Sequence, residues 1–181
     1  LTQNKMTVVK AFTDFTVTEQ KDFSSSQDAD LQLLAKGMSL CSNAGIDEGL
    51  YGDPTEIALV AFTNAMHFPK GQLEKETPRI EELPFDSVRK RMSTLHQDGN
   101  HKVLYTKGAM DSILSHTDRI LVHGKVRPIT DDDKKRIEAQ NAAFSEEALR
   151  VLALAIGDEN KINEEHLIFV GMVAMIDPAR P

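Results

Sequence analysis

Three short β-prone segments follow one another in the middle of the chain: Arg79-Ile-Glu-Glu-Leu-Pro-Phe85, Arg91-Met-Ser-Thr-Leu-His96 and Lys102-Val-Leu-Tyr-Thr106. The Asp98-Gly99 pair lies between the second and the third segment. It is a tight-turn signal, because a two-residue hairpin needs positive φ. The centre of the chain is therefore predicted to be a set of antiparallel strands with short connections.

The flanks add further strands and helices. Strands are predicted over residues 5–17 (one or two), 119–127 (a hairpin turning at His123-Gly124), 151–156 and 167–174. Helices are predicted over residues 30–44, from 54 behind an Asp53 cap, 109–116, and 131–148 behind a Thr130 cap, with a charged linker at 72–78. Because the helices do not alternate strictly with the strands, the predicted fold class is α+β, a mostly antiparallel twisted sheet flanked by helices.

Composition narrows the class of protein. The 181 residues include 21 Lys+Arg, 28 Asp+Glu and a single cysteine, giving a net charge of −7. The length suits one domain with one core. The acidic balance argues against nucleic-acid binding, since phosphate contacts need clustered cations. The longest apolar stretch, 167–176, is too short to span a membrane. The chain starts at Leu1 rather than Met, so we expect a piece of a longer protein.

The most unusual local feature is the segment Phe85-Asp-Ser-Val-Arg-Lys-Arg-Met-Ser93. It places three consecutive cations, Arg89, Lys90 and Arg91, in an acidic protein. In a strand, Arg89 and Arg91 would lie on one face and Lys90 on the other. A phosphate-bearing ligand can use one of these cations while Phe85 stacks on its base. The alternative is a solvated edge strand protected by charge, with Phe85 in the core.

A second candidate is Lys107-Gly108-Ala109, at the end of a predicted strand. Gly108 and Ala109 leave the backbone open to a ligand, and the following helix offers its N-terminus to an anion. The spacing does not match a Walker loop, and an ordinary turn is the alternative interpretation.

Two further sites have both a structural and a functional interpretation. Thr55-Glu56 fits a helix capping box opened by Asp53. Arg150 can reach a phosphate, or it can pair with the acids Glu146 and Glu147 of the preceding helix. No metal site is expected, because the six histidines are scattered and there is one cysteine.

Taken in order, these motifs resemble the P-type ATPases, particularly the type II calcium-transporting pumps, bacterial ones included. Residues 1–8 resemble the continuation of the family's phosphorylation motif. The other matching motifs are Gly52-Asp-Pro-Thr-Glu56, Phe85-Asp-Ser-Val-Arg-Lys-Arg-Met-Ser93, Lys107-Gly108-Ala109, Leu149-Arg-Val-Leu-Ala-Leu-Ala155 and Asp177-Pro-Ala-Arg-Pro181. The resemblance implies a nucleotide-binding (N) domain at 9–174, a strand entering from the phosphorylation domain at 1–8, and a returning hinge at 175–181 with Asp177 and Arg180.

The resemblance also implies roles for individual residues. Phe85 would stack on adenine, Glu56 with Thr55 would meet the adenine edge, and Met92 would line the base pocket. Lys90 and Lys107 would lie near the base and phosphates, with Lys107 at the depth of the pocket, and Arg150 would contact the phosphate chain. The full nucleotide-binding set comprises Thr55, Glu56, Phe85, Arg89, Lys90, Met92, Lys107, Gly108, Ala109 and Arg150.

The implied partners are ATP and ADP, with Mg²⁺ ligated mainly by the phosphorylation domain, and the phosphorylation and actuator domains of the same parent chain. The γ-phosphate would pass to an aspartate on the phosphorylation domain. We therefore expect this chain to be a monomer with no catalytic residue, binding ATP without hydrolysing it, at the cytoplasmic face of a membrane that the parent protein spans. Calcium is the expected ion, although manganese, sodium and proton pumps share these motifs.

Two features depart from the family pattern. The chain has Lys107-Gly-Ala-Met-Asp111 where many relatives have Lys-Gly-Ala-Pro-Glu, and Asp177-Pro-Ala where they have Asp-Pro-Pro. Two functions of other classes remain as alternatives. One is a non-catalytic protein-interaction module that uses the basic Arg89–Arg91 strand on an acidic partner. The other is an autonomous hydrolase, for which the purified chain would have to show turnover.

Overall fold

A computed structural model describes residues 5–44 and 53–177 of the chain. In this part the strands are β1 (Thr7–Thr13), β2 (Thr16–Glu19), β3 (Arg79–Asp86), β4 (Arg91–Asp98), β5 (His101–Gly108), β6 (Thr117–Val122), β7 (Lys125–Pro128), β8 (Arg150–Gly157) and β9 (Leu167–Ile176). The helices are α1 (Ala29–Leu40), α2 (Pro54–Ala65), α3 (Lys70–Glu76), α4 (Met110–Leu114) and α5 (Asp131–Glu146), with a 3₁₀ turn at Gln20–Asp22.

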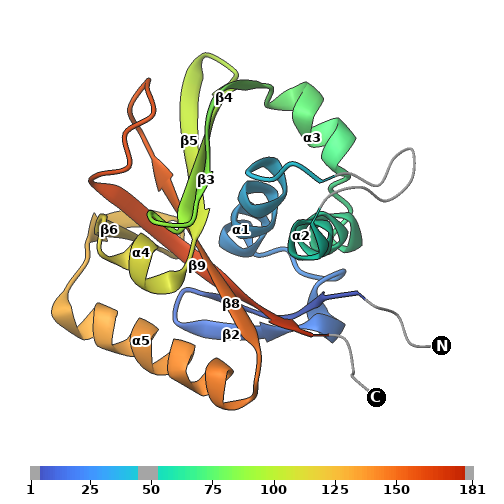
Figure 1. Cartoon of the computed structure of the whole chain (residues 1–181), viewed down its shortest axis with the longest axis vertical. Coiled ribbons are helices and arrows are strands. Elements are labelled where there is room, and N and C mark those ends of the chain that lie inside the picture. Colours follow the sequence, from blue (N-terminus) through green and yellow to red (C-terminus); the bar gives the residue numbers. More distant parts are fainter. Residues whose placement is uncertain (1–4, 45–52, 178–181) are drawn as a thin grey trace.

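The strands form one mostly antiparallel sheet, which confirms the predicted α+β class (Figure 1). Its order is β2-β1-β9-β8-β5-β4-β3, and the hairpin of β6 and β7 joins through a parallel pairing of β6 with β9. The first and last strands of the described chain, β1 and β9, are neighbours, with Thr7 opposite Ile176. At the other end of the order, β4 is the one described strand that pairs with β3, so β3 is an edge strand of the described sheet.

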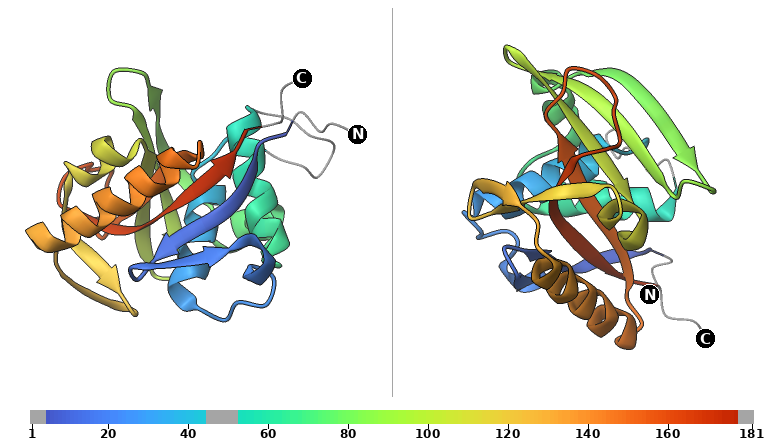
Figure 2. Two further views of the ribbon diagram at one scale, coloured as in Figure 1. Left: turned by 90° about the horizontal axis from the view of Figure 1, so that it is seen from below. Right: turned by 90° about the vertical axis from the view of Figure 1, so that its left-hand side faces the viewer.

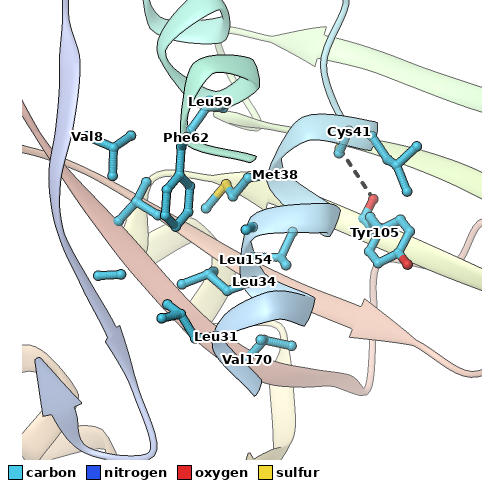
Figure 3. Packing of buried hydrophobic residues seen from close by; sticks show 14 of the residues in the cluster. Val8, Leu31, Leu34, Met38, Cys41, Leu59, Phe62, Tyr105, Leu154 and Val170 are labelled. Atoms are coloured by element: carbon cyan, nitrogen blue, oxygen red, sulfur yellow. Dashed lines mark hydrogen bonds between the residues drawn. The ribbon is translucent and has the colours of Figure 1, made fainter. Parts of the chain in front are cut away.

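Helices cover both faces of the sheet, with α1, α2 and α3 on one side and α4 and α5 on the other (Figures 1 and 2). The central strand β9 is buried along its length except at Ile176, because it packs against both helical layers. Alternation sends Val173 to the α1 side and Met172 to the α5 side. Figure 3 shows Leu34 and Met38 of α1 among the side chains of the first layer.

Local signals explain where several elements begin and turn. Thr130 Oγ1 accepts from the Asp133 backbone N–H at 3.0 Å, and Asp133 accepts from the Thr130 N–H at 2.9 Å, which is a complete capping box at α5. His123 and Gly124 both have positive φ in the β6–β7 turn, as a type I′ hairpin requires. In the β4–β5 hairpin Asp98 pairs with His101, so the two-residue loop begins at Gly99, one residue later than predicted.

The prediction of a charged linker at 72–78 is wrong, since residues 70–76 form α3. Glu, Lys and Gln are good helix formers, and the buried Leu73 fixes the helix to the core. A run of charged residues is therefore a poor indication of a loop.

The prediction that Arg89 and Lys90 lie in a strand is also wrong. Residues 87–90 form the turn between β3 and β4, and Lys90 has a φ of 61°. Asp86 initiates this turn, because its carboxylate accepts from the Val88 N–H at 2.7 Å. Strand alternation consequently does not decide where these two cations point.

Within residues 5–44 and 53–177, no helix is both long and apolar enough to cross a membrane.

Candidate functional site

A cavity of about 310 Å³ opens where the start of α2 meets the strands β4, β5 and β8. Its volume is at the lower end of the range usual for small-molecule sites. The cavity is lined by Asn43, Asp53, Thr55, Glu56, Phe85, Met92, Lys107, Gly108, Arg150 and Leu152. Seven of the ten predicted site residues are among these, although they come from four separate stretches of sequence.

A largely buried ion pair forms part of the cavity lining. Lys107 Nζ donates to Glu56 Oε2 at 3.0 Å, and the two side chains are only 7% and 17% exposed. The helix start is capped by Asp53, whose carboxylate accepts from the Thr55 N–H at 2.9 Å. The Glu56 carboxylate turns to Lys107 rather than completing the predicted capping box. The pair offers an acceptor and a donor side by side to the polar edge of a ligand.

An aromatic ring lies open to solvent beside this pair. Phe85, at the end of the edge strand β3, is 61% exposed and lines the cavity. The alternative that places Phe85 in the core is therefore wrong. Met92 of the neighbouring strand β4 is buried and adds an apolar surface to the same cavity. Together they provide a flat face and an apolar wall, which suit a planar ring.

Gly108 lines the cavity, but its lack of a side chain also serves the protein's own backbone. A Cβ added there would meet the Lys90 carbonyl oxygen, and the Arg91 Cβ at 2.7 Å. The same Lys90 carbonyl accepts from the Ala109 N–H at 3.1 Å. The sequence interpretation, in which this glycine leaves room for a ligand, thus missed its close contact with the β3–β4 turn.

Arg150 stands at the start of β8, more than half exposed. Its guanidinium lies 3.8 Å from the Asp177 carboxylate, which follows the end of β9. Arg150 makes neither of the alternative pairings, with Glu146 or with Glu147, and Glu147 instead accepts from Lys10 at 2.8 Å. Among the residues that the structure describes, the ion-pair partner of Arg150 is thus a distant one, and the guanidinium can turn toward a ligand in the cavity.

Three of the predicted residues do not line the cavity. Arg89 is directed to Glu164, with its Nε 3.1 Å from the Glu164 Oε1. Lys90 is exposed in the β3–β4 turn, and Ala109 is the N-cap of α4. The remaining predicted hinge residue, Arg180, lies outside the described residues.

Three lining residues were missed. Leu152 is two residues beyond Arg150 on the same strand, so strand alternation could have indicated it. Asp53 was recognised only as a helix cap. Asn43 carries no sequence signal of its own; it follows α1, and Arg79 fixes it by donating to its Oδ1 at 2.9 Å.

Two other features of the described residues, a groove and a cluster of carboxylates, lie outside this cavity. A larger groove of about 570 Å³ between β1 and α2 is mostly apolar, with Lys5 as its one charged lining residue. Asp14, Asp28 and Asp30 bring carboxylate oxygens within 4.8 Å of one another, and none of them lines the 310 Å³ cavity. Burial and the neighbouring Asp30 raise the pKa of Asp14 to about 6. Neither feature combines an exposed aromatic ring with convergent charges.

Comparison with known proteins agrees with the motif order. The family model described as P-type ATPase, cytoplasmic domain N, matches residues 30–181. Calcium-transporting ATPase 1 of Lactococcus lactis is 41% identical over 189 residues, covering 99% of this chain and 21% of that protein. Calcium-transporting ATPase 1 of Bacillus cereus is 43% identical over 187 residues, again covering 99% of this chain and 21% of that protein. The chain thus spans about a fifth of the length of these relatives.

Proposed function

Because the chain belongs to the P-type ATPase family, as the cytoplasmic domain N, we propose that its 310 Å³ cavity binds ATP for a cation pump, one that transports calcium. In this proposal the domain holds the adenosine end of the nucleotide. The γ-phosphate is carried to an aspartate on the adjacent phosphorylation domain of the parent protein. Residues 1–8 and 175–181 are the connections to that domain.

The observation that carries the proposal is the exposed ring of Phe85 beside the buried pair of Glu56 and Lys107. Stacking of a base on an aromatic side chain contributes about 1–3 kcal/mol. A large aromatic side chain that remains in water at the mouth of a cavity supports a planar ligand, since burial in the core would otherwise be more favourable.

The polar groups suit the edge of adenine. The Glu56 carboxylate can accept from the exocyclic amine, and the Lys107 ammonium can donate to a ring nitrogen. Thr55, one residue before Glu56, adds a hydroxyl that in this structure donates to Met6 Sδ at 3.3 Å. The helix start thus contributes both a cap and two groups for the ligand.

The phosphates would leave the cavity past Arg150. This guanidinium is more than half exposed and only loosely paired with Asp177, so a phosphate oxygen can replace the carboxylate at small cost. With one stacked base and a few charged contacts, we expect an affinity for ATP on the order of 0.1–1 mM.

We further propose that the chain by itself does not hydrolyse ATP. Phosphoryl transfer needs positioning, metal ions that neutralise charge, and an acceptor. The residues that line the cavity account for positioning. Mg²⁺ and the acceptor aspartate would belong to the phosphorylation domain of a membrane-spanning parent protein, and the actuator domain would be a further partner.

The alternative of a protein-interaction module loses its main support. Arg89 and Lys90 of its basic segment lie in a turn rather than in a strand, and both Arg89 and Arg91 pair with Glu164. The charges of these two arginines are therefore already engaged within the domain.

The test is a titration of the chain with ATP, followed by amide NMR shifts and calorimetry. Phe85→Ala should weaken binding about 10-fold, within the range set by the stacking energy. Val88→Ala is the matched control, because Val88 is 88% exposed nearby and does not line the cavity. Equal ATP affinity in the Phe85→Ala variant and the unmodified chain would refute the assignment of the cavity.

A further inference from the structure

The turn between β3 and β4 is held by a carboxylate from a distant loop. Glu164 lies in the loop between β8 and β9, and its side chain is only 8% exposed. Its Oε1 accepts from Arg89 Nε at 3.1 Å and from Arg91 Nε at 2.9 Å. One carboxylate thus fixes the last part of the turn and the first residue of β4.

Further hydrogen bonds complete the network. Ser93 Oγ donates to the second oxygen of Glu164. Ser112 Oγ, from α4, donates to the Arg89 carbonyl, and Arg91 donates to Ser112 Oγ at 3.1 Å. Burial alone would raise the pKa of Glu164, but the hydrogen bonds from Arg89 and Ser93 and the charges of both arginines outweigh it and lower the pKa. Glu164 is therefore ionised at neutral pH.

This network adjoins the cavity through the backbone. The turn follows Phe85 and precedes Met92, and both of these residues line the cavity. The Arg89 guanidinium also donates to the carbonyl of Pro84, next to Phe85, at 3.4 Å. Because β3 is an edge strand and its residues from Ile80 to Asp86 are exposed, core packing does little to fix the Phe85 ring.

We propose that Glu164 is a positioning residue for the nucleotide cavity, which holds Arg89 and Arg91 so that the β3–β4 turn presents Phe85 to the ligand. This inference rests on the proposed function, since it concerns the same cavity. Glu164 itself does not line the cavity and is not expected to touch the nucleotide.

The positioning role and simple electrostatics predict opposite changes in ATP affinity when the charge of Glu164 is removed. Removing a negative charge near a polyanionic ligand should strengthen ATP binding by Coulomb attraction and free two guanidiniums. Loss of positioning should weaken ATP binding instead. It should also weaken binding of adenosine, an uncharged ligand that reports on the base site alone.

The experiment compares Glu164→Gln with Glu165→Gln, which changes the next residue of the same loop. Glu165 is exposed and pairs with His116, so Glu165→Gln removes the same charge without changing a contact to the turn. We expect Glu164→Gln to weaken both ATP and adenosine by about 5-fold, part of the loss expected for a lost stack, with amide exchange at 87–90 accelerated. Glu165→Gln should leave both affinities and this exchange unchanged.

If the Glu164→Gln variant does not fold, Arg89→Gln is the second test. It removes the two hydrogen bonds from Arg89 to Glu164 and leaves Glu164 bonded to Arg91 and Ser93. The same direction is expected for adenosine. Unchanged or tighter adenosine binding in the folded variant would overturn the positioning role while leaving the proposed function standing. If the unmodified chain binds neither ligand, the proposed function itself fails, and the positioning role fails with it.

Discussion

Substitution of Gly108 by alanine tests how tightly the cavity wall is built. The added Cβ would lie 2.7 Å from Arg91 Cβ and 2.8 Å from Arg91 Cα, and it would press on the Lys90 carbonyl. Two of these three contacts are with backbone atoms, so a change of rotamer cannot relieve them. The β3–β4 turn would have to move away from β5.

The magnitude follows from two opposing effects. Overpacking of this kind destabilises by about 1–3 kcal/mol. Replacing a strand glycine by alanine otherwise gains about 0.5–1 kcal/mol. We therefore expect a net loss of about 1–2 kcal/mol, which for a chain of this length lowers the melting temperature by about 2–8 °C. ATP binding should weaken as well, because Phe85 lies at the end of β3, two residues before the displaced turn.

Thermal denaturation and an ATP titration measure the two effects separately. Gly124→Ala is the control, since Gly124 has a φ of 78° with nothing near its added Cβ. Backbone strain there costs about 1–2 kcal/mol, a similar loss of stability. The control should bind ATP normally because Gly124 does not line the cavity. If Gly108→Ala melts at the unmodified temperature and binds ATP normally, the proposed close packing of the turn on β5 is incorrect.

Two further substitutions probe buried charge. Lys107→Met leaves the Glu56 carboxylate without its cation, so urea denaturation should show a free energy of unfolding lower by about 1–3 kcal/mol. Part of this loss should return in the double variant that also carries Glu56→Gln. Equal stability of the single and double variants would argue against the pair. Asp14→Asn should stabilise the chain at pH 7. The pKa of Asp14 is raised to about 6 in the folded chain, so the protonated carboxyl contributes its full stability below about pH 4, and this contribution is lost as the pH rises through 6. The gain should therefore vanish in melts at pH 4, and a gain independent of pH would contradict the role of this titration.

Local chemistry made much of the fold predictable. Caps such as Thr130 and turns such as His123-Gly124 are decided by neighbouring residues, and the structure confirms both. The apolar runs at 151–156 and 167–174 likewise predicted the strands β8 and β9. The charged segment 70–76 could not be assigned in this way, because its helix depends on contact between Leu73 and the distant core.

The sequence indicated most of the residues that line the candidate site, but not how they contact one another. The motif order placed Glu56, Phe85 and Lys107 in one set, and the structure brings all three to one cavity. It did not indicate that Glu56 and Lys107 pair with each other, because these residues are 51 positions apart and lie on different elements, α2 and β5. The partner of Arg89 was equally out of reach, since Glu164 is 75 residues further along the chain.

The antiparallel pairing of β1 with β9, with Thr7 opposite Ile176, has a consequence for engineering. Two neighbouring strands bring entry and exit to one edge of the domain, so a short peptide joining them would close the chain without distorting the sheet. New termini could then be cut at the exposed His123-Gly124 turn, giving a circular permutant. The same geometry suits insertion of the domain into a surface loop of another protein, because both connections leave the domain close together.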